Sequence, residues 1–189
     1  MTSLAPQPRA PLTGLSGVTG LIALTLLLGT GPPVQAQPVP NVLFRHLSVE
    51  DGLSHEGVHA VLQDRQGLMW FGTQDGLNRY DGYDFTVFDH DPQDPTSLAV
   101  GWVWSLVEDT RGDLWVGTHG GGLHRFLPER NAFERFVTDP SDPSSLSHDI
   151  VRVIFEDSRG QLWVGTDGGL NALDAATGTF GTIPMTQRA

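Results

Sequence analysis

Apolar and polar positions follow the same order three times along this chain. Each copy has a short apolar run that ends at an Asp, a Gly three residues later, and a second apolar run that carries a Trp. The repeated residues are Trp70, Trp115 and Trp163, spaced 45 and then 48 residues apart. A period of this length, built from short runs between turn residues, is typical of β-propellers, in which each repeat is a four-stranded blade.

The middle copy predicts the strands of one blade. We expect residues 103–108 to form the innermost strand, followed by strands over residues 114–118, 123–126 and 133–137. A tight turn separates the first two strands, because Asp109 can accept hydrogen bonds from the following amides and a Gly can adopt a positive φ. The expected fold class is therefore all-β, a partial β-propeller of about three four-stranded blades.

Prolines in the segments between the copies rule out strand pairing there and predict loops that join one blade to the next. The expected blades are residues 58–98, 99–146 and 147–189. Residues 37–57 precede them, and residues 42–47 resemble an outer strand without inner strands before it. We expect this strand to complete a further blade that is absent here. Since a ring needs at least about four blades, the sequence is expected to be a fragment of a longer gene product.

Residues 1–36 are expected to form a signal peptide. Arg9 is the only charged residue before Arg45, and an apolar stretch covers residues 15–28. Helix-breaking Gly and Pro residues follow, and residues 34–36 include the small side chains that a signal peptidase prefers. The stretch is shorter than the ~20 residues that span a bilayer. We therefore expect export to the periplasm and a mature chain that starts at Gln37, with an uncleaved membrane anchor as the alternative.

Composition excludes several classes of function. The chain has 22 Asp and Glu residues against 11 basic ones, all of them Arg, for a formal net charge of −11. Such a chain has no basic stripe to displace counterions from phosphates, so nucleic acid is not an expected partner. It also contains no Cys, which excludes disulfides, thiolate metal sites and a Cys nucleophile.

The three copies resemble the two-component regulator propeller repeat. That pattern joins an apolar strand ending in Glu-Asp to a Leu-Trp-Val-Gly-Thr strand and a later Gly-Leu pair. The copies here span residues 64–77, 109–123 and 157–170. The resemblance implies an extracytoplasmic sensor whose propellers precede an immunoglobulin-like domain, a membrane span and a histidine kinase or diguanylate cyclase. Its implied partners are the remaining blades, the C-terminal signalling domains and a second copy in a homodimer.

Most of the repeated residues have a structural interpretation. The Trp of each copy is expected to pack between blades, since aromatic side chains bury large areas. The Asp of each copy is expected to cap its turn. Asp89, Asp91 and Asp94 resemble a calcium loop, but prolines interrupt the spacing and no Glu closes it, which favours a solvated loop. We expect no metal, no cofactor and no catalytic residue.

A ligand is expected at one mouth of the propeller channel, where the loops entering the inner strands meet the loops between second and third strands. The predicted contacts are His55, Gln74, Asp75, Trp102, His119, His148 and Asp167. Solvent-exposed loop residues without a ligand are the alternative for each of them. The ligand class is left open between a small molecule and a glycan.

Three functions compete on the sequence. The leading hypothesis is a non-enzymatic sensory input region of a two-component histidine kinase or a diguanylate cyclase. The second is an exported propeller enzyme that acts on polysaccharide, which would need paired carboxylates at the channel mouth. The third is a protein-binding scaffold, for which the fold alone is no evidence.

Overall fold

The computed structural model describes residues 43–174 and 176–183. The chain divides into two units, residues 1–43 and residues 44–189, and the second contains every described strand. The predicted signal peptide and the first residue of the predicted N-terminal strand lie outside the described residues. Among the residues that are described, no helix is long and apolar enough to cross a membrane.

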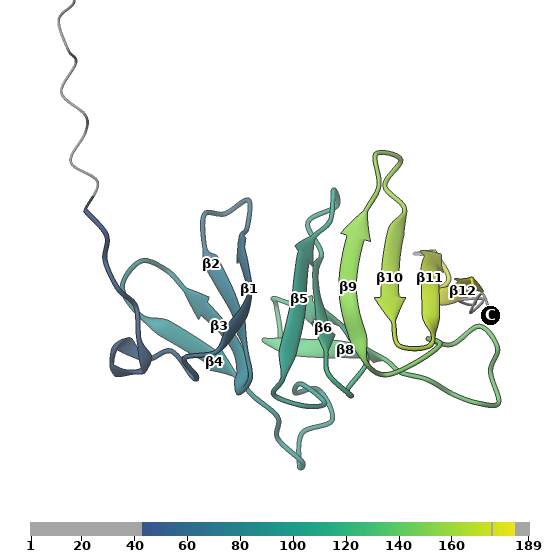
Figure 1. Ribbon diagram of the computed structural model, residues 1–189, viewed down its shortest axis with the longest axis horizontal. Helices are drawn as coiled ribbons and strands as arrows, with labels where there is room; N and C mark the ends of the chain where they lie inside the picture. The colour runs from purple at the N-terminus through teal and green to yellow at the C-terminus, as the bar shows by residue number, and fades with distance from the viewer. Residues whose placement is uncertain (1–42, 175, 184–189) are drawn as a thin grey trace, which may run out of the picture. The chain divides into compact units, whose positions relative to one another are not determined.

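Three four-stranded antiparallel sheets form the described fold, each with its strands in chain order (Figure 1). Blade 1 consists of β1 (Val58–Gln63), β2 (Met69–Thr73), β3 (Gly76–Tyr80) and β4 (Phe85–Phe88). Blade 2 consists of β5 (Val103–Glu108), β6 (Leu114–Thr118), β7 (Leu123–Leu127) and β8 (Ala132–Phe136). Blade 3 consists of β9 (Val151–Glu156), β10 (Leu162–Thr166), β11 (Gly169–Asp174) and β12 (Thr179–Ile183). The expected all-β partial propeller is confirmed, and the strands of blade 2 match their expected bounds to within one residue.

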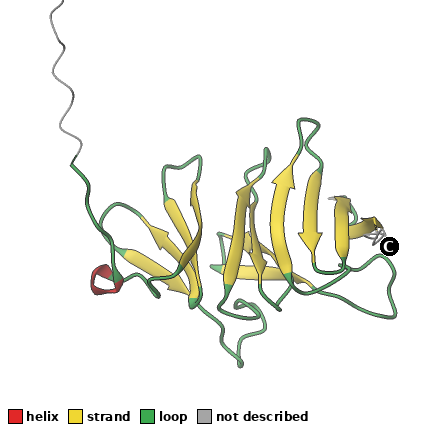
Figure 2. Cartoon of the chain, viewed as in Figure 1, coloured by secondary structure: helices red, strands yellow, loops and turns green. Residues whose placement is uncertain are grey.

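Residues before blade 1 do not form the expected strand. Within the described part, residues 43–47 have no regular structure, and the 3-10 helix η1 (Val49–Asp51) follows them (Figure 2). A strand exists only where another strand pairs with it, and the outer strands of the three sheets do not pair with this segment. Leu43 and Phe44 are almost fully exposed. That these residues complete a further blade stays a prediction.

The Asp of each copy caps its turn as expected. In blade 2, Asp109 Oδ1 accepts hydrogen bonds from the amides of Arg111 and Asp113, both over 2.9 Å. Gly112 closes the turn with a φ of 94°, a conformation that L side chains rarely adopt. Asp64 and Asp157 make the same pair of backbone contacts in their own turns. The turn is therefore a local consequence of the Asp-to-Gly spacing.

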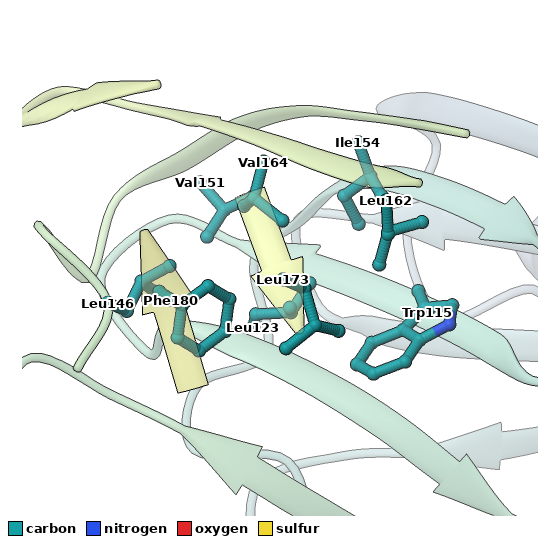
Figure 3. Packing of buried hydrophobic residues seen from close by; sticks show 9 residues of the cluster. All are labelled: Trp115, Leu123, Leu146, Val151, Ile154, Leu162, Val164, Leu173 and Phe180. Atoms are coloured by element: carbon teal, nitrogen blue, oxygen red, sulfur yellow. The ribbon is translucent and has the colours of Figure 1, made fainter. Parts of the chain in front are cut away.

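The core lies between the blades. One cluster joins blades 1 and 2 around Trp70, and a second joins blades 2 and 3 around Trp115. Figure 3 shows the second cluster, in which Trp115 and Leu123 of blade 2 face side chains of blade 3 such as Val151. Burying each such aliphatic side chain contributes about 1.5–3 kcal/mol. The predicted packing of Trp70 and Trp115 between sheets is confirmed, whereas Trp163 remains partly exposed.

Glycines let neighbouring blades approach closely. A Cβ atom on Gly117 of β6 would lie 2.6 Å from Val151 Cγ1 of β9, and one on Gly72 of β2 would lie 2.6 Å from Val103 Cγ1 of β5. Both valines are fully buried. In blades 1 and 2, the Gly of the Trp-containing strand therefore leaves room for the first residue of the next inner strand.

A buried polar residue of the third strand holds each entry loop. Asn78 Oδ1 accepts from the Ser54 amide over 2.9 Å, and Asn171 Oδ1 accepts from the Ser147 amide over 3.1 Å. In blade 2 the same position is His124, whose Nε2 accepts a hydrogen bond from the amide of Ala99, the residue that replaces Ser in this blade. Burial, reinforced by the nearby charge of Arg135, lowers the pKa of His124 to about 3. The imidazole is therefore neutral, as an acceptor at Nε2 must be.

Candidate ligand-binding site

Each inner strand carries an irregularity in its pairing at the same place. The register of β1 with β2 shifts between Val58 and Ala60, and β5 and β9 shift at the equivalent residues. One residue per blade is left out of the ladder, namely His59, Trp104 and Arg152. Such bulges re-aim a side chain and occur often beside functional sites. The three blades thus place three chemically different side chains at one repeated position.

Aromatic rings gather around the bulged residue of blade 2. His119 lies in the turn between β6 and β7. The centroid of its ring is 4.5 Å from the ring centroid of Trp102 and 4.6 Å from that of Trp104. The backbone supports this arrangement, because the His119 amide donates to the Trp102 carbonyl over 2.9 Å. The ring centroid of His59, in blade 1, lies 6.2 Å from the ring centroid of Trp102. Side chains of the entry loop, the inner strand and a turn therefore share one aromatic group.

Blade 3 contributes charge to the same group. The Arg152 guanidinium lies 4.2 Å over the ring of Trp104, within the range of a cation–π contact. Asp167, in the turn between β10 and β11, accepts two hydrogen bonds from Arg152, over 2.6 and 2.9 Å. We call His59, Trp102, Trp104, His119, Arg152 and Asp167 the axial cluster.

Electrostatics at the axial cluster follow from this ion pair. The hydrogen bond from Arg152 lowers the pKa of Asp167, and the charges of Arg152, His148 and His119 act in the same direction. The same hydrogen bond raises the pKa of Arg152 above its ordinary value. Both groups are therefore charged at neutral pH. The cluster offers aromatic faces, N–H donors and one carboxylate acceptor, a combination that suits a ring-shaped ligand with polar substituents.

Four of the seven residues predicted from the sequence lie in or beside this cluster. Trp102, His119 and Asp167 belong to it, and the charge of His148 acts on Asp167. His148 also has a local role, since its Nδ1 accepts from the Ile150 amide over 3.0 Å.

Of the other three predicted residues, His55 lies in the loop that enters blade 1, and Gln74 and Asp75 lie in the turn between β2 and β3. His55 Nδ1 accepts from the Gly57 amide over 2.8 Å, beside the Gln74 side chain. The Asp75 amide donates to Thr73 Oγ1 within its own turn. That turn meets the loop before β5, because the Gly76 amide donates to the Gly101 carbonyl over 2.7 Å.

The sequence-based list missed Trp104 and Arg152 and left out His59. The signal that could have found them is their position directly after the identical residues Val58, Val103 and Val151. A residue that varies within an otherwise repeated strand is less suited to a packing role than its constant neighbours. Strand alternation alone would still place its side chain on a blade face. Only the bulge changes the direction of that side chain.

Two other features of the chain have local explanations. Asp91 and Asp94, part of the calcium-like spacing, accept hydrogen bonds from the amides of Gln93 and Thr96 two residues later. Within the described residues, no group of three or more His, Asp or Glu side chains is placed to hold a metal ion.

A cavity of about 210 Å³ lies away from the axial cluster, between blades 2 and 3 beside Trp115.

Three adjoining four-stranded blades with an axial cluster define part of a β-propeller. The family model of the two-component regulator propeller matches residues 52–75, 97–120 and 145–168. The chain therefore carries three copies of this family's repeat, as the pattern of its sequence indicated. Each matched segment runs from an entry loop to the turn after the second strand, so the segments contain all seven predicted contact residues.

Known proteins share this fold and parts of the sequence. The extracellular domain of the hybrid two-component system BT3049 from B. thetaiotaomicron is 30% identical, with a TM-score of 0.69, over 74% of this chain and 20% of that one. Histidine kinase P4 of Formosa agariphila is 41% identical over 59 residues, which are 31% of this chain and 4% of that protein. Virginiamycin B lyase from Staphylococcus aureus, 16% identical with a TM-score of 0.51 over 72% of this chain and 45% of that one, shows the fold alone. The chain thus spans a small part of both signalling relatives.

Proposed function

We propose that this chain is an extracytoplasmic sensory input region of a two-component signalling protein. The observation that carries the proposal is the likeness to the BT3049 extracellular domain, which extends over three in-phase repeats and 74% of this chain. The matched segment of Histidine kinase P4 supports the same class. The predicted signal peptide supports a periplasmic location. The output domain would be a histidine kinase or a diguanylate cyclase.

The axial cluster is the proposed ligand-binding site. Its members come from all three blades, so a bound ligand would contact β1, β5 and β9 together. A ligand shifts an equilibrium between two arrangements only by its difference in affinity for them. Contacts that bridge blades provide such a difference, since a change in the packing of blades 2 and 3 alters the distance between Trp104 and Arg152. The ligand class remains a small molecule or a glycan.

Signalling by the full-length protein tests this proposal. A panel of neutral and acidic oligosaccharides and small organic acids would be added to cells that carry the full-length protein and a transcriptional or cyclic-dinucleotide reporter. We expect one class of compound to change the output of the wild type and to lose its effect in Trp104→Ala. The matched control is Tyr83→Ala, which removes an exposed aromatic side chain outside the axial cluster.

Location is tested separately with alkaline phosphatase fused after residue 183, which is active only outside the cytoplasm. An inactive fusion, or a full-length protein with neither a kinase nor a cyclase domain, would contradict the proposal. A compound that acts equally on the wild type and Trp104→Ala would leave the sensory role intact and move the ligand site elsewhere.

A further inference from the structure

The cavity between blades 2 and 3 shares no residue with the axial cluster. Its walls come from β6, β7 and β8 of blade 2, and from β11 and the turn between β11 and β12 of blade 3. Because the strands of each blade run antiparallel in chain order, this turn lies at the opposite end of the sheets from the turn that carries His119. We call it the side cavity, and its lining includes Trp115, Arg125, Glu134, Phe136, Leu173 and Thr177.

Arg125 is central to the polar wall of the side cavity. Its Nη2 lies 2.6 Å from Glu134 Oε2, and its Nη1 lies 3.8 Å from Asp113 Oδ2. The guanidinium carbon is 5.9 Å from the centroid of the Trp115 ring, within the range of a cation–π contact. Arg125 Nε, however, is buried and has no hydrogen-bond partner among the described residues. A buried donor without an acceptor costs free energy, so a ligand that supplies an acceptor would be stabilised here.

The interface of blades 1 and 2 provides an internal comparison for the size of the side cavity. Arg79 occupies the position of Arg125, and its guanidinium carbon lies 5.8 Å from the centroid of the Trp70 ring. The cavity beside Arg79 has a volume of about 110 Å³, roughly half that of the side cavity. One of its walls is Phe126, which occupies the position that Leu173 has in blade 3. The smaller Leu173 side chain therefore leaves more room in the side cavity.

The outer strands give the two cavities different charges. In blade 2, Glu134 of β8 stands opposite Arg125 of β7, whereas in blade 1 Thr86 of β4 stands opposite Arg79 of β3. The interface of blades 1 and 2 thus lacks both the carboxylate at this position and the larger volume. The side cavity combines a guanidinium, a carboxylate and room for a small molecule.

We propose that the side cavity binds a small neutral polyol, of the size of one sugar ring, as a second ligand of this protein. A hydroxyl group both donates and accepts hydrogen bonds. Neighbouring hydroxyls of one ring can therefore accept from Arg125 Nε and donate to the Glu134 carboxylate. The carboxylates of Glu134 and Asp113 disfavour an anion, and the Arg125 guanidinium disfavours a cation. The volume is below the ~300–1,000 Å³ of sites for drug-sized ligands, which favours one ring over an oligosaccharide.

A polyol in the side cavity would contact two blades at once. Arg125 and Glu134 belong to blade 2, and Thr177, whose side chain is exposed, belongs to the opposite wall in blade 3. A ligand that binds only the packed arrangement stabilises that arrangement. Occupancy of the side cavity would therefore stabilise the interface of blades 2 and 3, and this effect does not depend on the sensory role or on the axial cluster.

Ligand-observed NMR titration of the purified full-length protein tests the proposal. The probes are D-glucose, D-galactose, L-arabinose and myo-inositol, each added alone. We expect at least one of them to bind with a dissociation constant of about 1 mM or tighter. Glu134→Thr, which reproduces Thr86 of blade 1, should weaken that binding by about tenfold or more, because the hydroxyl loses a charged acceptor. Leu173→Phe, which reproduces Phe126 of blade 2, should also weaken it, because the larger ring fills the cavity.

D-Glucuronate tests the chemical class, since it adds a carboxylate to the ring of D-glucose. We expect it to bind more weakly than the best neutral probe, because Glu134 and Asp113 repel it. Equal or tighter binding of D-glucuronate would overturn the assignment to a neutral ligand.

Glu129→Thr is the matched control, because it removes an exposed carboxylate of the same blade that does not line the side cavity. The proposal would be overturned by an equal loss of affinity in this control or by unchanged affinity in Glu134→Thr. Absence of binding by all four neutral probes at about 10 mM, where a millimolar site is mostly occupied, would overturn it as well. Binding that Trp104→Ala abolishes and Glu134→Thr spares would move the polyol to the axial cluster. Tryptophan emission checks that each variant is folded, since Trp70 and Trp115 are buried.

Discussion

Trp115 donates a hydrogen bond from Nε1 to Oδ2 of Asp109 over 3.0 Å, and both side chains are almost fully buried. The contact ties the second strand of the blade to the turn before it. Trp70 and Asp64 make the same contact over 2.8 Å in blade 1. In blade 3, Trp163 donates to Asp157 over 3.2 Å. The constant spacing of six residues between Asp and Trp therefore serves the turn and the inter-blade core together.

Asp109→Ala should lower the free energy of unfolding by about 2–4 kcal/mol, because buried N–H donors lose their acceptor. The measurement is chemical denaturation followed by tryptophan emission. Asp142→Ala is the control, since its exposed carboxylate accepts only from Ser144 in a loop. Similar losses for the two variants would contradict the role given to the Asp109 contact.

Stability should fall as the pH decreases from about 6.5 toward 3, because His124 has a pKa of about 3 in the folded chain. The unfolded chain binds a proton at the ordinary His pKa of about 6.5, so below that pH it holds more protons than the folded chain. The contribution of His124 is complete above pH 6.5. The slope approaches about 1.4 kcal/mol per pH unit as the pH falls.

The double variant His124→Asn with Ala99→Ser tests this cause, since it reproduces the Asn–Ser pairs of blades 1 and 3. Its free energy of unfolding should change little between pH 6.5 and 5, where ordinary carboxylates remain charged. Urea denaturation at several pH values gives both curves. Parallel curves for the wild type and the double variant would assign the pH dependence to other groups.

Gly117→Ala should destabilise the chain by about 1–3 kcal/mol, because its methyl group would overpack against Val151 at the interface of blades 2 and 3. Adding Val151→Ala should recover part of the loss in a double-mutant cycle measured by denaturation. Gly181→Ala is the control, since a Cβ there would have no neighbour within 4 Å. Purely additive losses would argue against the contact.

Arg152→Ala should leave the unfolding midpoint unchanged while it abolishes the response of the full-length protein to its ligand. The pair with Asp167 is solvent-exposed, and exposed ion pairs contribute little to stability. Thermal unfolding and the reporter assay give the two readouts. A marked fall in the unfolding midpoint would assign Arg152 a structural role.

The sequence by itself determined the local structure of this protein. The spacing from Asp109 to Gly112 fixes a turn, and the apolar runs on each side of it fix two strands, because both depend on residues only a few positions apart. The same reasoning applied three times gave the blade count, the strand bounds and the family. The loops that carry Trp102, His119 and Asp167 followed from the order of strands within a blade.

Only the tertiary structure decided what those loops and strands meet. The contact of Trp104 with Arg152 depends on bulges and on residues 48 positions apart along the chain, which no local pattern reports. The hydrogen bond from the Arg65 amide to the Glu108 carboxylate depends likewise on how the sheets of blades 1 and 2 pack. Residues 43–47 show the limit most clearly: their pattern permits a strand, but a strand needs another strand to accept its hydrogen bonds, and that partner is a property of the assembled fold.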